Sequence, residues 1–155
     1  MKGYITCFFL YVSFVSCAQT NDPKQYANSI DIQDIQEQVT LLTSREFEGR
    51  EAGKPGGRKT AKYIQQKFEA IGLLAVVDSL QSKSYYQRVP LRGKSFSNNI
   101  LGLVRGSQFP EVVIIITAHY DHLGMKGNTF YPGADDNASG VSALLEIAQA
   151  FAEAS

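Results

Sequence analysis

The chain has 155 residues, of which 44% are hydrophobic and 19% are charged, and its formal net charge at pH 7 is zero. This composition is typical of one soluble globular domain. Because the sequence has no basic stripe that could neutralise phosphates, it gives no support for a nucleic-acid partner.

The N-terminal segment has the pattern of an export signal. Lys2 precedes an apolar run over residues 5–15, which is shorter than the ~20 residues that a membrane-spanning helix needs. A buried N-terminal helix or strand is the alternative, but the polar segment 19–25 follows at once. We therefore expect residues 1–17 to be a signal peptide and residues 18–30 to be a polar tether.

Cys17 lies where the apolar run stops and resembles the lipidated cysteine of a bacterial lipobox. Phe14 departs from that pattern, which prefers leucine there, and ordinary signal cleavage after Ala18 is the alternative. Either route exports the protein, as a cell-envelope lipoprotein anchored at Cys17 or as a periplasmic or secreted protein. Neither route leaves a pair of cysteines for a disulfide, and membrane contact is expected only through the lipid.

Three stretches have the periodicity of amphipathic helices. The first is predicted over residues 31–44, where apolar side chains recur every three or four positions. A glycine-rich, charged loop follows over 45–57, in which Pro55 suits a helix entry, and the second helix is predicted over 60–70. The third helix is predicted from Ala138 to the end of the chain.

The region between the second and third helices favours β-structure. Residues 73–78 and 85–91 are predicted to form an edge pair, and residues 97–104 to form a further strand. The β-branched run over 111–117 predicts a central strand buried on both faces. This order of elements predicts an α/β fold, so we expect chemistry in the loop that follows the central strand.

That loop holds both histidines of the chain, His119 and His122, together with Asp121, Asp135 and Asp136. Imidazole and carboxylate groups are common zinc ligands in proteins. Each is weak evidence alone, because acidic residues before a helix often cap it and a histidine after a strand is often structural. The segments HYDHLG and GADDNASG are much more specific together.

These two segments closely resemble the co-catalytic two-zinc aminopeptidase family, whose superfamily also contains glutamate carboxypeptidases and glutaminyl cyclases. Residues 42–50 and 97–102 match the family as well, and the resemblance covers residues 32–155. It implies a three-layer α/β/α fold with a mixed, largely parallel central sheet. Residues 31–155 would then be the N-terminal part of a zinc peptidase domain, with the sheet incomplete.

The resemblance also implies roles within the loop. His119 would bind one Zn²⁺, Asp136 would bridge the two Zn²⁺ ions of a complete site, and Asp121 would be the catalytic auxiliary that orients the His119 ring. His122 is interpreted as a structural or pocket-wall residue rather than a ligand. The family often has a cis peptide after the bridging aspartate, which would fall at Asp136–Asn137.

Several other polar residues are interpreted as structural. Arg50 is expected to form an ion-pair network with Glu46 and Glu48, because all three lie in the glycine-rich loop. Glu146 lies among apolar residues of the third helix and is interpreted as an ordinary helix residue.

The implied reaction is hydrolysis of the N-terminal peptide bond of a peptide or protein by a metal-activated water. In the family, the general base and the remaining ligands follow the bridging aspartate, beginning with a Glu-Glu pair. No such pair occurs up to Ser155, so we expect this chain to be an inactive part of a longer protein. Two alternatives stay open: a non-catalytic, peptidase-like binding module, and a single-zinc transferase of the glutaminyl cyclase type.

Overall fold

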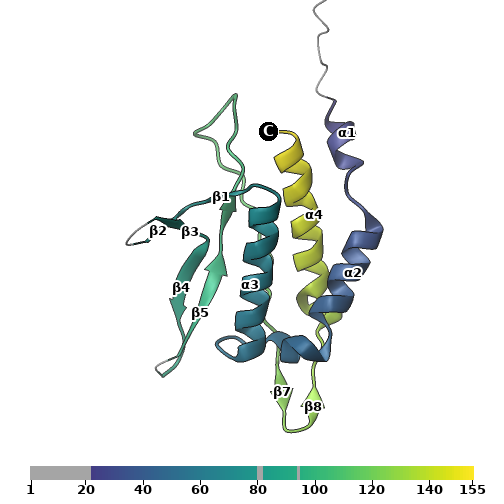
Figure 1. The fold of residues 1–155 in the computed structure, drawn as a ribbon, viewed down its shortest axis with the longest axis vertical. Coiled ribbons are helices and arrows are strands. Elements are labelled where there is room, and N and C mark those ends of the chain that lie inside the picture. The colour runs from purple at the N-terminus through teal and green to yellow at the C-terminus, as the bar shows by residue number, and fades with distance from the viewer. Residues whose placement is uncertain (1–21, 80–81, 94) are drawn as a thin grey trace, which may run out of the picture.

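A computed structural model describes residues 22–79, 82–93 and 95–155 (Figure 1). The predicted signal peptide, the start of the predicted tether and Cys17 lie outside these residues. Within the tether, Pro23–Ala27 form a short helix, α1, which Asp22 caps and which has no buried residue. Among the described residues, no helix combines the length and apolarity that a membrane span requires.

The three predicted helices are confirmed. Helix α2 covers Ile32–Leu42, helix α3 covers Pro55–Ala70 and helix α4 covers Ser139–Glu153. Helix α3 begins at Pro55 rather than at residue 60, because the fixed φ of proline suits the first helical turn and its missing N–H has no helical acceptor there. A 3₁₀ segment, η1, covers Arg45–Arg50 between α2 and α3.

The core lies where helices α2, α3 and α4 meet (Figure 1). Most of its buried apolar side chains come from these three helices and from η1; they include Leu42, Phe47, Ile64, Phe68, Val141 and Leu145. Burial of each such side chain stabilises the fold by about 1.5–3 kcal/mol. Helix α4, which follows the candidate site in the chain, is therefore fixed to the two helices that precede it.

Glu146 differs from its prediction as an ordinary helix residue. Its side chain is 2% exposed and accepts hydrogen bonds from the Gln38 amide at 2.8 Å and from the Asp31 backbone N–H at 3.2 Å. The carboxylate thus joins α4 to α2 inside the core. Burial, and secondly the charge of Glu146, raises the pKa of Tyr63 on α3 to about 12.

The described strands form four separate antiparallel pairs: β1 (Leu74–Ala75) with β6 (Gly102–Leu103), β2 (Val77–Asp78) with β3 (Lys83–Ser84), β4 (Tyr86–Pro90) with β5 (Phe96–Ile100), and β7 (Met125–Lys126) with β8 (Thr129–Phe130). The predicted strand over 97–104 is present as β5 and β6. The predicted edge pair is wrong, because residues 73–78 and 85–91 take different partners. Each forms a ladder with a segment nearer to it in space.

The predicted central strand over 111–117 is also wrong in this structure. Residues 112–116 pair with no other strand among the described residues, and Ile114 is 82% exposed. A central strand needs a hydrogen-bonded strand along each edge, and none of the described segments pairs with residues 112–116. The fold is mixed α/β, but a largely parallel, three-layer sheet is not present in the described part of the chain.

Candidate metal centre

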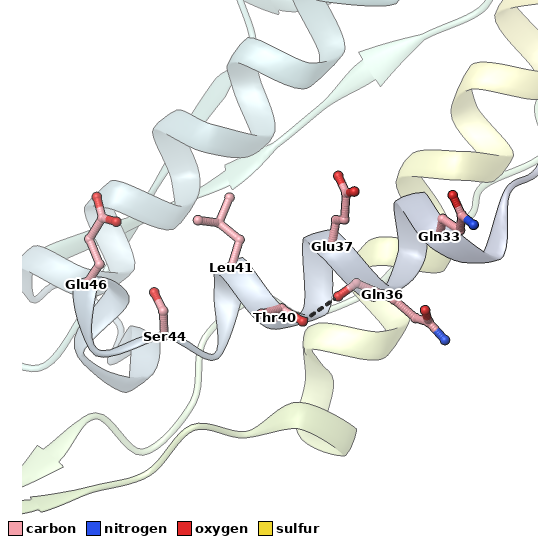
Figure 2. Close-up of a pocket in the computed structure, with 7 residues that line it drawn as sticks. All are labelled: Gln33, Gln36, Glu37, Thr40, Leu41, Ser44 and Glu46. Carbon is pink, nitrogen blue, oxygen red and sulfur yellow. Dashed lines mark hydrogen bonds between the residues drawn. The ribbon is translucent and has the colours of Figure 1, made fainter.

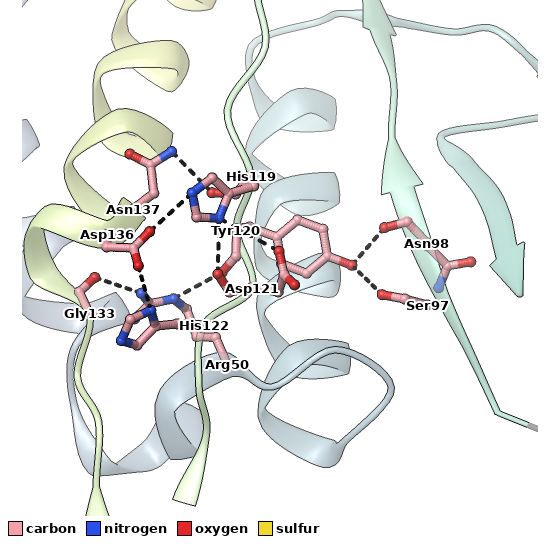
Figure 3. Close-up of polar contacts among 10 residues, drawn as sticks. All are labelled: Arg50, Ser97, Asn98, His119, Tyr120, Asp121, His122, Gly133, Asp136 and Asn137. Carbon is pink, nitrogen blue, oxygen red and sulfur yellow. Dashed lines mark hydrogen bonds and ion pairs between the residues drawn. The ribbon is translucent and has the colours of Figure 1, made fainter. Parts of the chain in front are cut away.

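Two loop segments that carry the predicted ligands lie side by side (Figure 3). His119 and His122 come from the segment that follows the exposed run 112–116. Asp136 comes from η2 (Ala134–Ala138), a distorted turn that leads directly into helix α4. Because the core holds α4 in place, the aspartate stands on a rigid support while the histidines approach it from the other segment.

His119 and Asp136, the two predicted metal ligands, are in contact. Nε2 of His119 lies 3.1 Å from Oδ1 of Asp136. The His119 side chain is 55% exposed and that of Asp136 is 67% exposed, so both groups are open to solvent and to an incoming ion. The structure therefore brings together the ligand pair that the sequence predicted, at the surface of the molecule.

The other ring nitrogen of His119 faces Asp121, but the nearer atom is the backbone oxygen of Asp121 and not its carboxylate. Nδ1 lies 3.1 Å from the backbone oxygen of Asp121 and 3.7 Å from its carboxylate oxygen Oδ1. The backbone oxygen is thus the hydrogen-bonding partner, and the carboxylate lies just beyond hydrogen-bond distance. If Nδ1–H donates to this oxygen, Nε2 carries a lone pair on the side of Asp136 and can bind a metal ion there.

His122 makes a contact that the sequence did not reveal. Its Nδ1 lies 3.2 Å from Oδ2 of Asp136, so each carboxylate oxygen of Asp136 faces one imidazole. The His122 side chain is only 12% exposed and packs over Gly133. A side chain at Gly133 would lie 2.5 Å from the ring, and its φ of +57° also favours glycine. The structural role predicted for His122 is consistent with this packing. Its contact with Asp136 was not predicted.

The peptide bond between Asp136 and Asn137 is cis, as the resemblance implied. The Asn137 amide donates to the backbone oxygen of His119 at 3.3 Å. This bond links the same two segments that the His119–Asp136 contact links.

The polar residues of η1 are structural, but they do not form the predicted ion-pair network. Arg50 is fully buried and donates to four backbone carbonyls instead of to carboxylates. Glu46 pairs with Lys59 at 2.5 Å, and the carboxylate of Glu48 accepts the Gly56 N–H at 3.2 Å. A single sequence could not show that carbonyl groups from distant segments converge on one arginine.

The donor set fits part of a zinc site. Two ligand atoms of a tetrahedral zinc, each about 2.1 Å from the ion, lie about 3.4 Å apart, close to the 3.1 Å between His119 Nε2 and Asp136 Oδ1. One nitrogen and one carboxylate oxygen are ordinary zinc ligands. Within the described ranges, however, no group of three or more histidine, cysteine or acidic side chains is arranged to hold a metal. The described residues thus supply two ligands, fewer than a closed site requires.

The pocket in Figure 2 lies away from this site. It follows the outer face of α2 and is lined by Gln33, Gln36, Glu37, Thr40, Leu41, Ser44 and Glu46. None of these residues belongs to the histidine–aspartate cluster, and the pocket contains no nucleophile paired with a base. It therefore offers no competing catalytic site.

Comparison with known proteins points to one family. Residues 99–155 match the model of peptidase family M28. The chain is 40% identical over 94 residues to the uncharacterized protein YfbL of Escherichia coli, a match covering 59% of this chain and 25% of that protein. It is 33% identical over 85 residues to a probable zinc metalloprotease of Leptosphaeria maculans, covering 53% of this chain and 19% of the relative.

A third relative is named as a subunit of a complex and not as a protease. The chain is 34% identical over 112 residues to the chicken BOS complex subunit NCLN, a match covering 72% of this chain and 18% of the relative. The chain thus spans a quarter or less of the length of each of these relatives. No solved structure gives a significant match. The matched segment 99–155 contains the whole histidine–aspartate cluster, and over this segment the chain is similar to peptidase family M28.

Proposed function

We propose that this protein is a zinc-dependent metallopeptidase of the aminopeptidase type, which hydrolyses N-terminal peptide bonds of peptides or proteins. One observation carries the proposal: the Nε2 atom of His119 faces a carboxylate oxygen of Asp136 at 3.1 Å, while Nδ1 of the same ring is held by Asp121. This is the arrangement that a zinc-binding imidazole needs, with one nitrogen oriented by a backbone or carboxylate oxygen and the other free to bind. The match of residues 99–155 to the model of peptidase family M28 supports hydrolase chemistry with zinc.

In the proposed site, His119 and Asp136 hold metal and Asp121 fixes the tautomer of His119. Two Zn²⁺ ions, when bound, would supply the activated water and polarise the scissile carbonyl. Asp136 offers one oxygen toward each of two histidines, so its two oxygens are already oriented in different directions, as a bridging carboxylate requires. His122 orients the second oxygen.

We also propose that the active protein is longer than these 155 residues. The described residues supply two ligands, whereas the relatives are four or more times as long as the segments that match. The exposed apolar run 112–116 fits the same idea, because further strands would pair with it and complete a three-layer α/β/α fold around a largely parallel sheet. The 155-residue chain alone is then inactive and binds zinc weakly.

Export is a further part of the proposal. The sequence of residues 1–17 supports it, with Cys17 as a lipid anchor in a bacterial cell envelope or with ordinary cleavage after Ala18. Mass spectrometry of the mature N-terminus separates the two routes: a diacylglycerol-modified Cys17 marks a lipoprotein, and a free Gln19 marks secretion. A mature protein that retains Met1 contradicts both.

Zinc binding by the chain itself tests the site. We expect Zn²⁺ to shift the side-chain ¹⁵N resonance of His119 Nε2 in a titration followed by NMR, and Asp136→Asn to weaken this response. Asp135→Asn is the matched control, since Asp135 is adjacent in sequence and forms no side-chain contact with either histidine among the described residues. An equal response in the Asp136 and Asp135 variants contradicts the assignment.

One comparison favours a second function. A relative is named as a subunit of a complex, not as an enzyme, so a non-catalytic, peptidase-like binding module is the alternative. A binding module has no need of zinc. Stoichiometric zinc in the purified longer protein therefore supports the peptidase, and its complete absence supports the module.

A further inference from the structure

Arg50 lies behind the candidate metal centre, and its side chain is fully buried. Its guanidinium donates four hydrogen bonds, all to backbone carbonyl oxygens. Nε donates to Tyr120 at 3.0 Å and Nη2 to Gly133 at 2.7 Å (Figure 3). Nη1 donates to Leu42 at 2.7 Å and to Pro132 at 2.6 Å. No carboxylate takes part. A buried cation whose hydrogen-bond acceptors are all carbonyl oxygens is unusual. The segments that carry these carbonyls indicate the role of Arg50.

The acceptors lie in three segments of the chain, of which the second and third are joined by the β7–β8 hairpin. Leu42 ends helix α2, Tyr120 lies between the two histidines of the site, and Pro132 and Gly133 directly precede the turn that carries Asp136. The fork of one guanidinium therefore joins the histidine segment to the aspartate segment. It also fixes both of them to the core through α2.

The backbone of the same turn strengthens this junction. The carbonyl of Arg50 accepts the N–H of His122 at 3.2 Å, and the carbonyl of Gly49 accepts the N–H of Gly124 at 2.9 Å. Gly49 approaches so closely that a Cβ there would lie 2.5 Å from the carbonyl oxygens of Gly124 and Tyr131. The backbone of His122 and Gly124, at the C-terminal end of the histidine segment, is thus hydrogen-bonded to η1.

The backbone at Arg50 is itself in a costly conformation. Its φ is +55°, and the preceding Glu48 also has a positive φ of +50°. Residues other than glycine avoid this left-handed region unless the surrounding structure holds them there. The convergence of side-chain and backbone hydrogen bonds on this turn supplies that constraint.

Charge adds a second relation between Arg50 and the site. Burial lowers the pKa of the Arg50 guanidinium, whereas the charges of Asp136 and Asp121 raise it. The guanidinium stays protonated under ordinary conditions. It therefore stands as a fixed positive charge behind the two carboxylates of the site, and it opposes their mutual repulsion without binding either of them.

We propose that Arg50 is a positioning residue for the metal centre: its guanidinium fork sets the distance between the segment of His119 and the segment of Asp136. The proposal rests on the proposed function for its purpose, but the positioning itself can be measured without metal. Lysine cannot replace arginine in this role, because one ammonium group cannot present a planar fork to carbonyls in three directions.

The first experiment uses the unmutated 155-residue chain, so it does not depend on whether a variant folds. Long-range NMR couplings across hydrogen bonds should connect the Arg50 guanidinium nitrogens with the carbonyl carbons of Tyr120, Pro132 and Gly133. The guanidinium protons should also be protected from exchange with solvent. A freely rotating guanidinium with averaged, rapidly exchanging protons would overturn the proposal.

The second experiment compares variants without metal. In Arg50→Lys we expect the NOE between the His122 ring and Gly133 to disappear, and the His122 and Gly124 amide protons to exchange roughly tenfold faster or more. Arg58→Met is the control for loss of an arginine, because Arg58 is exposed and donates to the single carbonyl of Gly53 at 2.6 Å. Phe68→Leu is the control for general destabilisation, since Phe68 is a core residue of α3.

The outcomes separate positioning from mere stability. Loss of the NOE in Arg50→Lys, but not in Phe68→Leu at an equal folded fraction, supports the proposal. Retention of the NOE in folded Arg50→Lys, or equal loss in both variants, overturns it. A zinc titration of the same samples tests the proposed function separately: if the unmutated chain shows the couplings but no zinc response, the metal assignment fails while the positioning role stands.

Discussion

The Nε2 atom of His119 lies 3.1 Å from Oδ1 of Asp136, and the β7–β8 hairpin lies between the two residues in the chain. Besides this hairpin, three further contacts hold the two segments together: the Arg50 fork, the Asn137 amide on the His119 carbonyl, and the His122 ring on the second oxygen of Asp136. Both partners are more than half exposed. A structural role alone does not explain why two polar, ionisable groups are held together at the surface.

The ligand pair can be removed without loss of the fold. We expect His119→Ala and Asp136→Asn to leave the thermal unfolding temperature within a few degrees of the unmutated value, because exposed side chains contribute little to stability. In the longer protein, each should lower peptidase activity by more than about a hundredfold, since even partners that only orient a ligand are worth 10–100-fold. Circular dichroism measures the unfolding temperature, and hydrolysis of an aminoacyl reporter measures the peptidase activity. Unchanged activity in Asp136→Asn contradicts the assignment.

Asp121 should affect metal affinity more than stability. Its backbone oxygen is the present partner of His119 Nδ1 and its carboxylate lies 3.7 Å away, so Asp121→Asn keeps one orienting contact and loses the negative charge. We expect zinc affinity to fall by about 10–100-fold. Competition with a chelator of known affinity measures this. An affinity equal to that of the unmutated protein would mean that the backbone oxygen alone orients the ring.

Glu146 is expected to stabilise the junction of α2 and α4. Replacing it by leucine leaves the Gln38 amide and the Asp31 N–H without their buried acceptor, which costs about 1–3 kcal/mol for each unsatisfied group. Urea unfolding measures the change in free energy. Glu153→Leu is the control, because Glu153 lies at the exposed end of the same helix. Equal effects of the two substitutions would contradict a role for the buried carboxylate.

Tyr63 should make the fold sensitive to alkali. Its folded pKa of about 12 lies above the unfolded value near 10, so the unfolded chain releases this proton first as the pH rises. The stabilising contribution is therefore complete below about pH 10 and is lost as the pH rises through 12. Tyr63→Phe cannot ionise, and its unfolding free energy should fall less steeply between these values. Parallel slopes for the two proteins, measured by urea unfolding at each pH, would contradict the assignment.

The exposed run 112–116 should make the isolated chain prone to aggregation. Its large aliphatic side chains are mostly exposed, as are Phe109 and Leu123 nearby in sequence, and contiguous apolar surface of this kind binds hydrophobic dyes and promotes association. We expect Ile114→Lys to lower dye fluorescence and the aggregated fraction without lowering the unfolding temperature. Light scattering and a thermal melt check this. A large loss of stability in Ile114→Lys would mean that the side chain is buried.

The sequence predicted what depends on local pattern. Three helices follow from apolar periodicity, and the strand over 97–104 and the cis bond at Asp136–Asn137 follow from local pattern and from resemblance. The resemblance assigned His119 and Asp136 to one metal site, and the two side chains are in contact. These features are specified by short segments or by motifs whose chemistry demands particular residues.

The features that the sequence did not predict depend on partners far away in the chain. Residues 111–117 have the composition of a buried strand, but a strand also needs neighbours, and the described residues provide none. Arg50 was expected to pair with nearby carboxylates, yet it binds carbonyls up to residue 133. Likewise, the burial of Glu146 and the contact of His122 with Asp136 cannot be predicted from the local hydrophobic periodicity.

The most direct test of the central claim is metal analysis of the longer protein together with an assay of N-terminal hydrolysis. We expect two zinc ions per molecule, hydrolysis of an aminoacyl reporter that a chelator abolishes and added Zn²⁺ restores, and loss of both zinc and activity in Asp136→Asn. A folded protein that contains no zinc and cleaves no N-terminal peptide bond after zinc is added would contradict the account.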